Sequence, residues 1–444
     1  MASSVNSGPR LDRLPISSFH YRIFWLIGAG MFFDGYDLYV GASVLGAAVA
    51  TKFAVLPQVP QFISWTFVGM TIGSVIAGFL GDKYGRRFTY QFNLMVFGLA
   101  SFAAAFAPDM EWLIAARFVM GLGLGAEIVV GYSTMTEFVP PASRGRWMAF
   151  MAFIVVAGFP ATSIISTFVI PVWGWRPMFV IAGVGAMVVW YLRKNLPESP
   201  RWLESNGREA EAEALMQKIE AEASGGRPLP APAVPAPMPV WSFGSLFSPT
   251  LLPRMIVGSV VLIVINTLIF GFVNWLPTFF GQQGISITRS LAYTMVLAIG
   301  SLVGCAIGAW SADYFGRKPT IIGASVLTIV AGAIYPYMKT PETLLSVGFV
   351  LIVGIYILTA LLYGVYTSEL FPTEVRLRAN GLCNMLGRGA TVVSPFIVLW
   401  LFKGYGVAGV IGLMIGLLII QIVVVAALGI ETNRRGLESL TAKA

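Results

Sequence analysis

The stretch Asp82-Lys83-Tyr84-Gly85-Arg86-Arg87 has a second, related copy later in the chain, Asp313-Tyr314-Phe315-Gly316-Arg317-Lys318. The same interval, to within one residue, relates a second set of positions, in which Glu137, Pro140, Arg144 and Arg146 correspond to Glu369, Pro372, Arg376 and Arg378. Polar motifs that keep their order and spacing indicate two halves that run through the structure in the same direction. This repeat predicts the architecture.

The segments between these motifs are apolar. Of the 444 residues, 57% are hydrophobic and 11% are charged, whereas roughly 25% of the residues of a soluble protein are charged; the mean hydropathy is +0.77. Runs of about 20 apolar residues have the length that crosses a bilayer as a helix. They predict transmembrane helices near 23–50, 61–81, 88–107, 111–137, 146–171, 176–195, 251–281, 290–312, 319–338, 341–370, 379–402 and 405–430. We therefore expect an all-α membrane protein with twelve transmembrane helices in two pseudo-symmetric six-helix bundles.

The polar segments divide the chain into five parts. We expect an N-terminal tail (1–22), a first bundle (23–195), a linker (196–250), a second bundle (251–430) and a C-terminal tail (431–444). Within the linker, the Ala/Glu-rich stretch 204–224 favours a helix, and the Pro/Ala-rich stretch 228–239 favours an extended tether.

The positions of the basic residues predict the orientation in the membrane. The formal net charge is +8, from 29 Lys and Arg against 21 Asp and Glu. With the N-terminus in the cytoplasm, only a few basic residues fall on the outer side, namely Lys52, Arg176, Arg289, Lys339 and Lys403, and two fall inside helices. All others are cytoplasmic, as the positive-inside rule requires. We expect a multi-pass protein of the plasma membrane, the inner membrane in a bacterium, with both termini cytoplasmic and no nucleic-acid partner.

Motifs for bond-making chemistry are absent from the sequence. No Gly-x-x-x-x-Gly-Lys-Ser/Thr loop and no zinc-ligand spacing occur, and Cys305 and Cys383 both lie in apolar helices. We expect a functional monomer that uses no cofactor or metal and is not an enzyme. A membrane-embedded enzyme and a transporter-like sensor are the alternatives from other classes.

The polar motifs carry a family resemblance. Gly78-x-x-x-Asp82-x-x-Gly85-Arg86-Arg87 resembles the loop signature of the major facilitator superfamily, and three further motifs agree with it: Arg117-x-x-x-Gly121-x-Gly123-x-Gly125, Pro197-Glu198-Ser199-Pro200-Arg201-Trp202-Leu203 and Glu369-x-x-Pro372-x-x-x-Arg376. The resemblance implies the sugar-porter-like branch, which also contains nicotinate permeases, aromatic-acid:proton symporters and organic-anion transporters.

Charged residues gather at the predicted cytoplasmic junctions of both halves. They are Asp82, Arg86, Arg87, Glu137, Arg144, Arg146, Glu198, Asp313, Arg317, Glu369, Arg376 and Arg378. Ion pairs among them can latch the two bundles when desolvated and release them when separated, which would bias a rocking equilibrium. The alternative is that they act only as topology determinants and helix caps.

Five charged residues lie inside the predicted spans: Asp34, Asp37, Arg117, Glu127 and Arg388. A charge at mid-bilayer costs roughly 2.5–3.5 kcal/mol on insertion scales, so a functional role is favoured over packing. A purely structural buried salt bridge is the alternative.

Depth along the helices predicts that Asp37 and Arg117 meet. Asp37 lies ~21 Å from the cytoplasmic start of its helix and Arg117 ~9 Å from the outer start of its own, which puts them at nearly the same level. Sugar porters are similar at both positions, and the resemblance implies that the two residues form the proton-coupling pair. Asp34 shares the face of Asp37 and is a second proton site or a gate. Glu127 lies about 80° round the helix from Arg117 and need not join that pair. Nicotinate permeases are similar at this position, and we expect Glu127 to take part in proton coupling as well.

Arg388 has the best context for binding substrate. Asn380, Asn384, Arg388 and Thr391 form one polar stripe on a helix, and Arg388 lies ~15 Å from the cytoplasmic end, near the midplane where secondary transporters bind solutes. A guanidinium there matches a carboxylate by two parallel hydrogen bonds. Candidate walls for a flat ring are Tyr39, Phe270, Asn274 and Tyr363.

These residues predict a proton-coupled symporter for a small organic carboxylate, such as a nicotinate- or benzoate-like acid. A sugar:proton symporter is the first alternative, but the glutamines of sugar porters are replaced here by Phe150-Met151-Ala152, Ala157-Gly158-Phe159 and Val264-Ile265. An organic-cation or drug transporter is the second, and its cavity should be acidic and lack Arg388.

Overall fold

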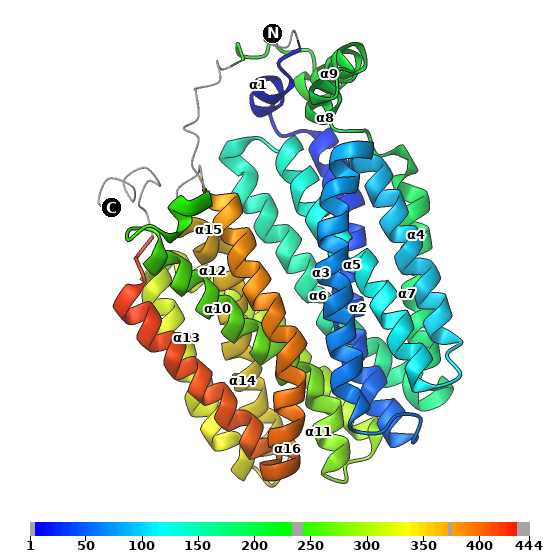
Figure 1. The fold of residues 1–444 in the computed structure, drawn as a ribbon, viewed down its shortest axis with the longest axis vertical. Helices are drawn as coiled ribbons and strands as arrows, with labels where there is room; N and C mark the ends of the chain where they lie inside the picture. The colour runs from blue at the N-terminus through cyan, green and yellow to red at the C-terminus, as the bar shows by residue number, and fades with distance from the viewer. Residues whose placement is uncertain (1–4, 233–242, 372–374, 433–444) are drawn as a thin grey trace.

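The computed structural model describes residues 5–232, 243–371 and 375–432, which are helical almost throughout and contain no β-strand. Two bundles stand side by side, and α1, α8 and α9 lie over one end of the first (Figure 1). We call this end of the molecule the linker face and the opposite end the far face.

The first bundle contains six long helices: α2 (Ser18–Ala50), α3 (Gln58–Tyr84), α4 (Arg86–Ala105), α5 (Met110–Phe138), α6 (Pro141–Trp173) and α7 (Arg176–Leu192). A 3-10 turn, η1 (Arg193–Asn195), follows α7. The linker contributes α8 (Pro200–Ser205), α9 (Glu209–Ser224) and η2 (Phe243–Phe247), and the N-terminal segment forms α1 (Ser7–Asp12).

The second bundle repeats this arrangement with more irregular helices. Its elements are α10 (Leu252–Gly271), η3 (Val273–Trp275), α11 (Leu276–Gln282), α12 (Ile287–Phe315), α13 (Arg317–Ile334), η4 (Tyr335–Tyr337), α14 (Pro341–Leu361), the π-helix η5 (Leu362–Tyr366), α15 (Thr367–Glu369) and α16 (Arg376–Leu428). Two predicted single helices are thus interrupted, one by η3 and one by the π-helix η5. π-Helical distortions occur frequently at functional sites.

The described residues supply the twelve predicted crossings. Nine of their helices are long and apolar enough to span a membrane. Two more crossings are α7, with 17 residues, and α2, whose hydropathy is lowered by Asp34 and Asp37. The last comes from α16, which bends back at Gly406 (φ 63°, ψ −155°) and therefore counts as two helices.

Close glycine contacts hold α3 against α5. A Cβ atom added at Gly69 would lie 2.2 Å from the Phe118 carbonyl oxygen, and one at Gly125 would lie 1.9 Å from the Met70 carbonyl oxygen. Small residues allow helix backbones to approach this closely inside a membrane, where lipid tails leave no hydrophobic drive for helix association.

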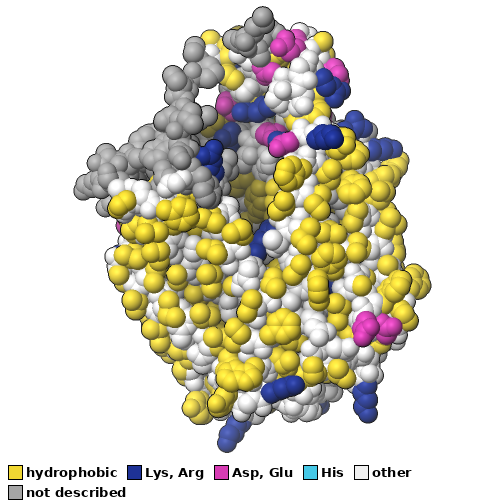
Figure 2. Space-filling view, in the orientation of Figure 1, with side chains coloured by type: hydrophobic (Ala, Val, Ile, Leu, Met, Phe, Trp, Pro, Cys, Tyr) yellow, Lys and Arg dark blue, Asp and Glu magenta, His cyan; other side chains and the backbone are white. Residues whose placement is uncertain are grey.

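The two bundles contact each other in the half of the molecule toward the far face. Ser64, near the start of α3, donates a hydrogen bond to the Val392 carbonyl (2.6 Å), and Phe67 packs against Phe270 with 4.4 Å between ring centroids. Figure 2 shows a hollow between the bundles that opens toward the linker face. The structure is therefore closed at the far face and open at the linker face.

The N-terminal helix is bound to the linker helix by ion pairs that the sequence analysis did not predict. The Arg10 guanidinium bonds Glu213 and Glu220, the latter at 2.7 Å, and Arg13 also reaches Glu220, at 2.6 Å. The hydrogen bond from Arg10 holds the pKa of Glu220 below its ordinary value. These charges fasten α1 to α9.

We predict that Glu220→Gln frees α1, because it weakens the contacts to both Arg10 and Arg13. Hydrogen exchange of residues 7–13 should accelerate at neutral pH in the variant. The matched control is Glu211→Gln, also on α9, whose carboxylate bonds only the exposed Arg208. In the native protein the contacts should persist from neutral pH down to the ordinary glutamate value of about 4.3 and weaken only below it, as Glu220 becomes protonated. Unchanged exchange in Glu220→Gln would contradict the account.

Candidate functional site

Both bundles carry the same charge cluster at the linker face. Arg86 bonds Asp82 (3.2 Å) and Glu137 (2.9 Å). Arg317 in the second bundle bonds Asp313 (2.9 Å) and Glu369 (3.2 Å). Each of these pairs joins residues of one half.

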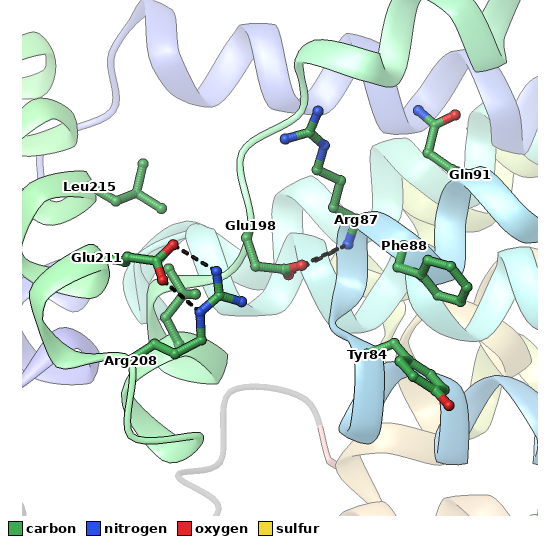
Figure 3. Close-up of a pocket in the computed structure, with 9 residues that line it drawn as sticks. Tyr84, Arg87, Phe88, Gln91, Glu198, Arg208, Glu211 and Leu215 are labelled. Carbon is green, nitrogen blue, oxygen red and sulfur yellow. Dashed lines mark hydrogen bonds and ion pairs between the residues drawn. The ribbon is translucent and has the colours of Figure 1, made fainter.

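A partly buried carboxylate caps the helix that follows each motif. Glu198 accepts hydrogen bonds from the backbone N–H groups of Arg86 (2.8 Å) and Arg87 (3.2 Å) at the start of α4, and Figure 3 shows this contact with Arg87. Burial raises the pKa of Glu198. A Cβ atom at Gly85, where φ is +93°, would lie 2.2 Å from this carboxylate, so the turn requires glycine.

The second half has the same cap, which the sequence analysis missed. Glu431 accepts hydrogen bonds from the backbone N–H groups of Arg317 and Lys318, each at 3.0 Å, beneath Gly316 with φ of +99°. Glu431 lies just beyond residue 430, the predicted end of the second bundle. The interval from Glu198 to Glu431 is 233 residues, within two of the intervals that relate the other motifs, and could have revealed this cap.

The remaining predicted latch residues have other surroundings. Arg87 donates to the Lys194 carbonyl (2.6 Å), Arg144 bonds Asp12 of the N-terminal segment (3.4 Å), and Arg146 lies over the ring of Phe150 (5.7 Å). Two further predicted residues are at the start of α16, where Arg378 lies in the first turn and the side chain of Arg376 lies outside the described residues.

A pocket of about 540 Å³ adjoins the Glu198 cap at the linker face (Figure 3). It is lined by Tyr84, Arg87, Phe88, Gln91, Glu198, Leu203, Arg208, Glu211 and Leu215. Its arginines already bond Lys194 and Glu211. The pocket also lies at the base of the linker helices and not between the bundles, so we do not take it as the solute site.

Asp37 and Arg117 form a buried ion pair, as the depth argument predicts. The Asp37 carboxylate accepts from Arg117 Nη1 at 2.5 Å, and their side chains are 0% and 3% exposed. Arg117 also donates to Thr66 Oγ1 (3.2 Å) and lies over the ring of Phe62 (5.0 Å). One carboxylate and one guanidinium balance each other here, and protonation of Asp37 would remove this balance.

Glu127 pairs with an arginine that the sequence analysis counted among the cytoplasmic charges. Arg193 Nη1 bonds Glu127 Oε1, and the Arg193 side chain is fully buried. Arg193 follows directly after α7, so its position resembles that of a loop residue. The signal was Glu127 itself, because an ionised glutamate inside a bundle needs a cationic partner.

Arg388 on α16 has no charged partner within the part of the chain that the structure describes. Among the described residues its guanidinium has no hydrogen bond or ion pair, and it interacts electrostatically with the ring hydroxyl of Tyr363. Tyr363 is 39% exposed although it belongs to a membrane-crossing segment. We infer that both side chains border the hollow.

The polar stripe around Arg388 is partly used by its own helix. Asn384 Nδ2 donates to the Asn380 carbonyl (2.9 Å), and Thr391 Oγ1 donates to the Arg388 carbonyl (2.6 Å). Thr391 is fully buried, whereas Asn380 and Asn384 keep intermediate exposure. The predicted stripe is therefore open at its linker-face end and closed at Thr391.

Three aromatic rings from three helices stack beyond Arg388. Tyr39 stacks on Phe159 (4.7 Å between centroids), Phe159 stacks on Tyr356 (6.0 Å), and the hydroxyl of Tyr356 donates to that of Tyr39 (2.8 Å). Tyr39 was predicted; Phe159 and Tyr356 were not. These rings join the two bundles, since α2 and α6 belong to the first and α14 to the second.

Two other predicted wall residues belong to the closed contact between the bundles. Phe270 packs on Phe67 and is 7% exposed. Asn274 is 4% exposed and donates to the Leu38 carbonyl (3.3 Å). They seal the far side of the hollow in this state and do not line it.

A family model described as "Sugar (and other) transporter" matches residues 24–444. The chain belongs to this family of membrane transporters. It is 36% identical to the inner membrane metabolite transport protein YdjE of Escherichia coli over 98% of both chains. It is also 30% identical to the niacin transporter NiaP of Acinetobacter baylyi, over 97% of this chain and 98% of that one.

Solved structures of other transporters have the same fold as this chain. A partially occluded inward open conformation of the xylose transporter XylE of E. coli superposes with a TM-score of 0.72 at 19% identity, covering 95% of this chain and 100% of that one. The transporter is thus a multi-pass membrane protein with the major facilitator fold, and it is not an enzyme.

We predict that Glu198→Gln and Glu431→Gln destabilise the two bundles to a similar extent, because each removes the charge that caps a helix start. Hydrogen bonds to charged groups contribute about 1.5–3 kcal/mol to stability. The amide oxygen of the glutamine variant still accepts these hydrogen bonds, so only part of this contribution is lost. Thermal unfolding in detergent should show a lower Tm for both variants. Glu342→Gln, exposed at the start of α14, is the control. A loss confined to one half would contradict the symmetry of the caps.

Proposed function

We propose that this transporter is a proton-coupled symporter of a small organic monocarboxylate with an aromatic or heteroaromatic ring, such as a nicotinate- or benzoate-like acid. The observation that carries the proposal is the Arg388 guanidinium, which borders the hollow with no hydrogen bond or ion pair among the described residues. An unpaired charge at this depth is expensive, and an anionic substrate would supply its partner.

A carboxylate suits this cation by geometry and by surroundings. A guanidinium binds a carboxylate through two parallel hydrogen bonds. Tyr363 lies next to Arg388 and is 39% exposed, so it provides aromatic surface for a flat ring. The relative NiaP, named a niacin transporter, supports a substrate of this class.

The Asp37–Arg117 pair supports proton coupling. The pair is buried and balanced, so binding a proton at Asp37 frees Arg117 and changes the relative energies of the two states of the carrier. A proton bound on one side of the membrane and released on the other drives the substrate in the same direction.

Transport proceeds by rocking of the two bundles about the substrate. The linker face is cytoplasmic and is open in this structure. In the opposite state, the charge clusters around Arg86 and Arg317 come together and latch this face, while the Tyr39–Tyr356 contact separates. The transporter acts as a monomer, because each chain holds both bundles and the hollow between them.

The sugar alternative is less well supported. The structures with the same fold include a D-xylose-proton symporter, but at 19% identity that likeness concerns the fold. Phe159 on α6 and Val264 and Ile265 on α10 are apolar and offer no hydrogen bonds to sugar hydroxyls. A transporter of organic cations is also disfavoured, because Arg388 would repel a cationic substrate.

We predict that Asp37→Asn abolishes accumulation of nicotinate against its gradient and preserves exchange of internal for external nicotinate, because the amide permanently imitates the protonated carboxyl. Proteoliposomes with an imposed pH gradient measure accumulation, and preloaded vesicles without a gradient measure exchange. Full accumulation in Asp37→Asn would overturn the assignment of Asp37.

We predict that Arg388→Ala weakens nicotinate binding by about 10- to 150-fold, which corresponds to the roughly 1.5–3 kcal/mol of a charge-assisted contact. Calorimetry on the purified transporter measures the affinity. Arg388→Lys should recover only part of it, since an ammonium lacks the planar fork.

The control for this prediction is nicotinamide, the neutral amide of the same acid. It should bind the native protein poorly and lose little affinity in Arg388→Ala, and the four combinations form a thermodynamic cycle. If nicotinamide loses as much affinity as nicotinate in Arg388→Ala, Arg388 maintains the shape of the cavity and does not bind the carboxylate.

A further inference from the structure

A second group of buried charges lies in the first bundle, on the linker-face side of the Asp37–Arg117 pair. It consists of Asp34 on α2, Glu127 on α5 and Arg193 on η1, which interact electrostatically. Their exposures are 1%, 1% and 0%. The cluster is thus fully enclosed and stands apart from the hollow bordered by Arg388.

The hydrogen bonds of Arg193 commit it to Glu127 and to the backbone of α2. Nη1 bonds Glu127 Oε1, Nε donates to the Leu26 carbonyl (2.7 Å), and Nη2 donates to the Ile27 carbonyl (2.7 Å). Its guanidinium lies over the ring of Tyr90 (4.7 Å). Arg193 is therefore fixed in place, and one of its two terminal nitrogens serves the carbonyl of Ile27 and not a carboxylate.

Gly30 makes room for this arrangement. A Cβ atom at Gly30 would lie 2.1 Å from Arg193 Nη2 and 2.6 Å from Glu127 Oε1. Asp34 lies one turn further along the same face of α2, and Asp37 follows after another turn. The rise of 1.5 Å per residue puts Asp34 about 6 Å from Gly30 and about 4.5 Å from Asp37 along the helix axis.

The charges of this cluster do not balance. Two carboxylates share one guanidinium, whereas Asp37 and Arg117 are matched one to one. Asp34 has no hydrogen bond or ion pair among the described residues, and Asp34 Oδ2 and Glu127 Oε2 are both buried without a hydrogen-bond partner. The other titratable groups that face the cluster are Asp37 on α2 and Tyr90 on α4. Neither supplies a positive charge.

We propose that Asp34 and Glu127 together form a second proton-binding site, which holds one proton in the state observed here. A proton on either carboxylate leaves one carboxylate for Arg193 and makes the cluster neutral, which removes the penalty for a buried unpaired charge. The two carboxylates titrate as one coupled unit. Whether this site takes part in transport rests on the proposed proton coupling. Whether it holds a proton is independent of that proposal.

The site gives the carrier a second proton position on α2, between Asp37 and the linker face. A proton that leaves Asp37 has a carboxylate one turn away and a further one on α5, so it can approach the linker face without entering the substrate hollow. Two protonatable positions also allow two protons for each substrate.

Infrared spectroscopy of the purified full-length chain in nanodiscs at neutral pH tests the proposal without any substrate. A protonated buried carboxyl gives a carbonyl stretching band that shifts in D₂O. Asp34→Asn and Glu127→Gln should each reduce the intensity of this band by the amount that one protonated carboxyl contributes, because the remaining carboxylate then balances Arg193. Arg193→Gln should increase the intensity contributed by this cluster to that of about two carboxyls, because no guanidinium then balances either carboxylate.

Asp37→Asn is the matched control, one turn away on the same helix, and should keep the band, because Asp37 is ionised beside Arg117. If Asp34→Asn and Glu127→Gln both leave the band unchanged, the second site is refuted, and loss of the band only in Asp37→Asn would place the proton on the outer pair instead. If Asp37→Asn still accumulates nicotinate, the proposed coupling fails, while the infrared result continues to decide the second site.

Discussion

Ionised side chains inside an apolar bundle are stable only when an opposite charge or a proton neutralises them, and the interior of this transporter is arranged around that constraint. Asp37 has Arg117 at 2.5 Å, and Glu127 has Arg193. Two positions depart from the rule: Asp34 has no cation of its own, and Arg388 has no anion among the described residues. A proton at the first and a carboxylate substrate at the second would complete the balance.

The two halves share their frame and differ in their interior. At the linker face Glu198 and Glu431 cap equivalent helices in the same way, so the repeat is retained where it fixes helix starts and turns. Inside the membrane, the first bundle holds three carboxylates and the second holds Arg388. This division fits a carrier in which the first bundle handles protons and the second contributes the charge that binds the solute. The aromatic rings of Tyr39 and Tyr356 then connect the two functions, because they join α2 to α14 across the contact between the bundles.

Much of the fold could be predicted because it follows from the period of apolar runs and from the repeated motif around Gly85 and Gly316. The Asp37–Arg117 contact could be predicted because rise per residue fixes depth, and a pair of opposite charges at one level has few other partners. Arg193 could not be assigned in the same way. It lies at a helix end, where a basic residue ordinarily faces water, and its burial comes from tertiary contacts with α2, α4 and α5.

Distortions of helices explain the other differences between the predicted and observed site. The turn η3 interrupts the predicted straight helix, and Asn274 on it reaches the Leu38 carbonyl at the contact between the bundles. The π-helix Leu362–Tyr366 carries Tyr363 beside Arg388. Side-chain direction at such breaks depends on tertiary packing, which a periodic pattern does not contain.

The most direct test of the account is uptake of labelled nicotinate by proteoliposomes of the native transporter under an imposed pH gradient, acidic outside. Protein-free liposomes measure the passive entry of the weak acid and are subtracted. We predict transporter-dependent accumulation above equilibrium that collapses with a protonophore and is competed by benzoate but not by nicotinamide or xylose. Uptake that does not depend on the pH gradient would contradict a proton-driven carboxylate carrier. Uptake that is inhibited by xylose but not by benzoate would contradict it as well.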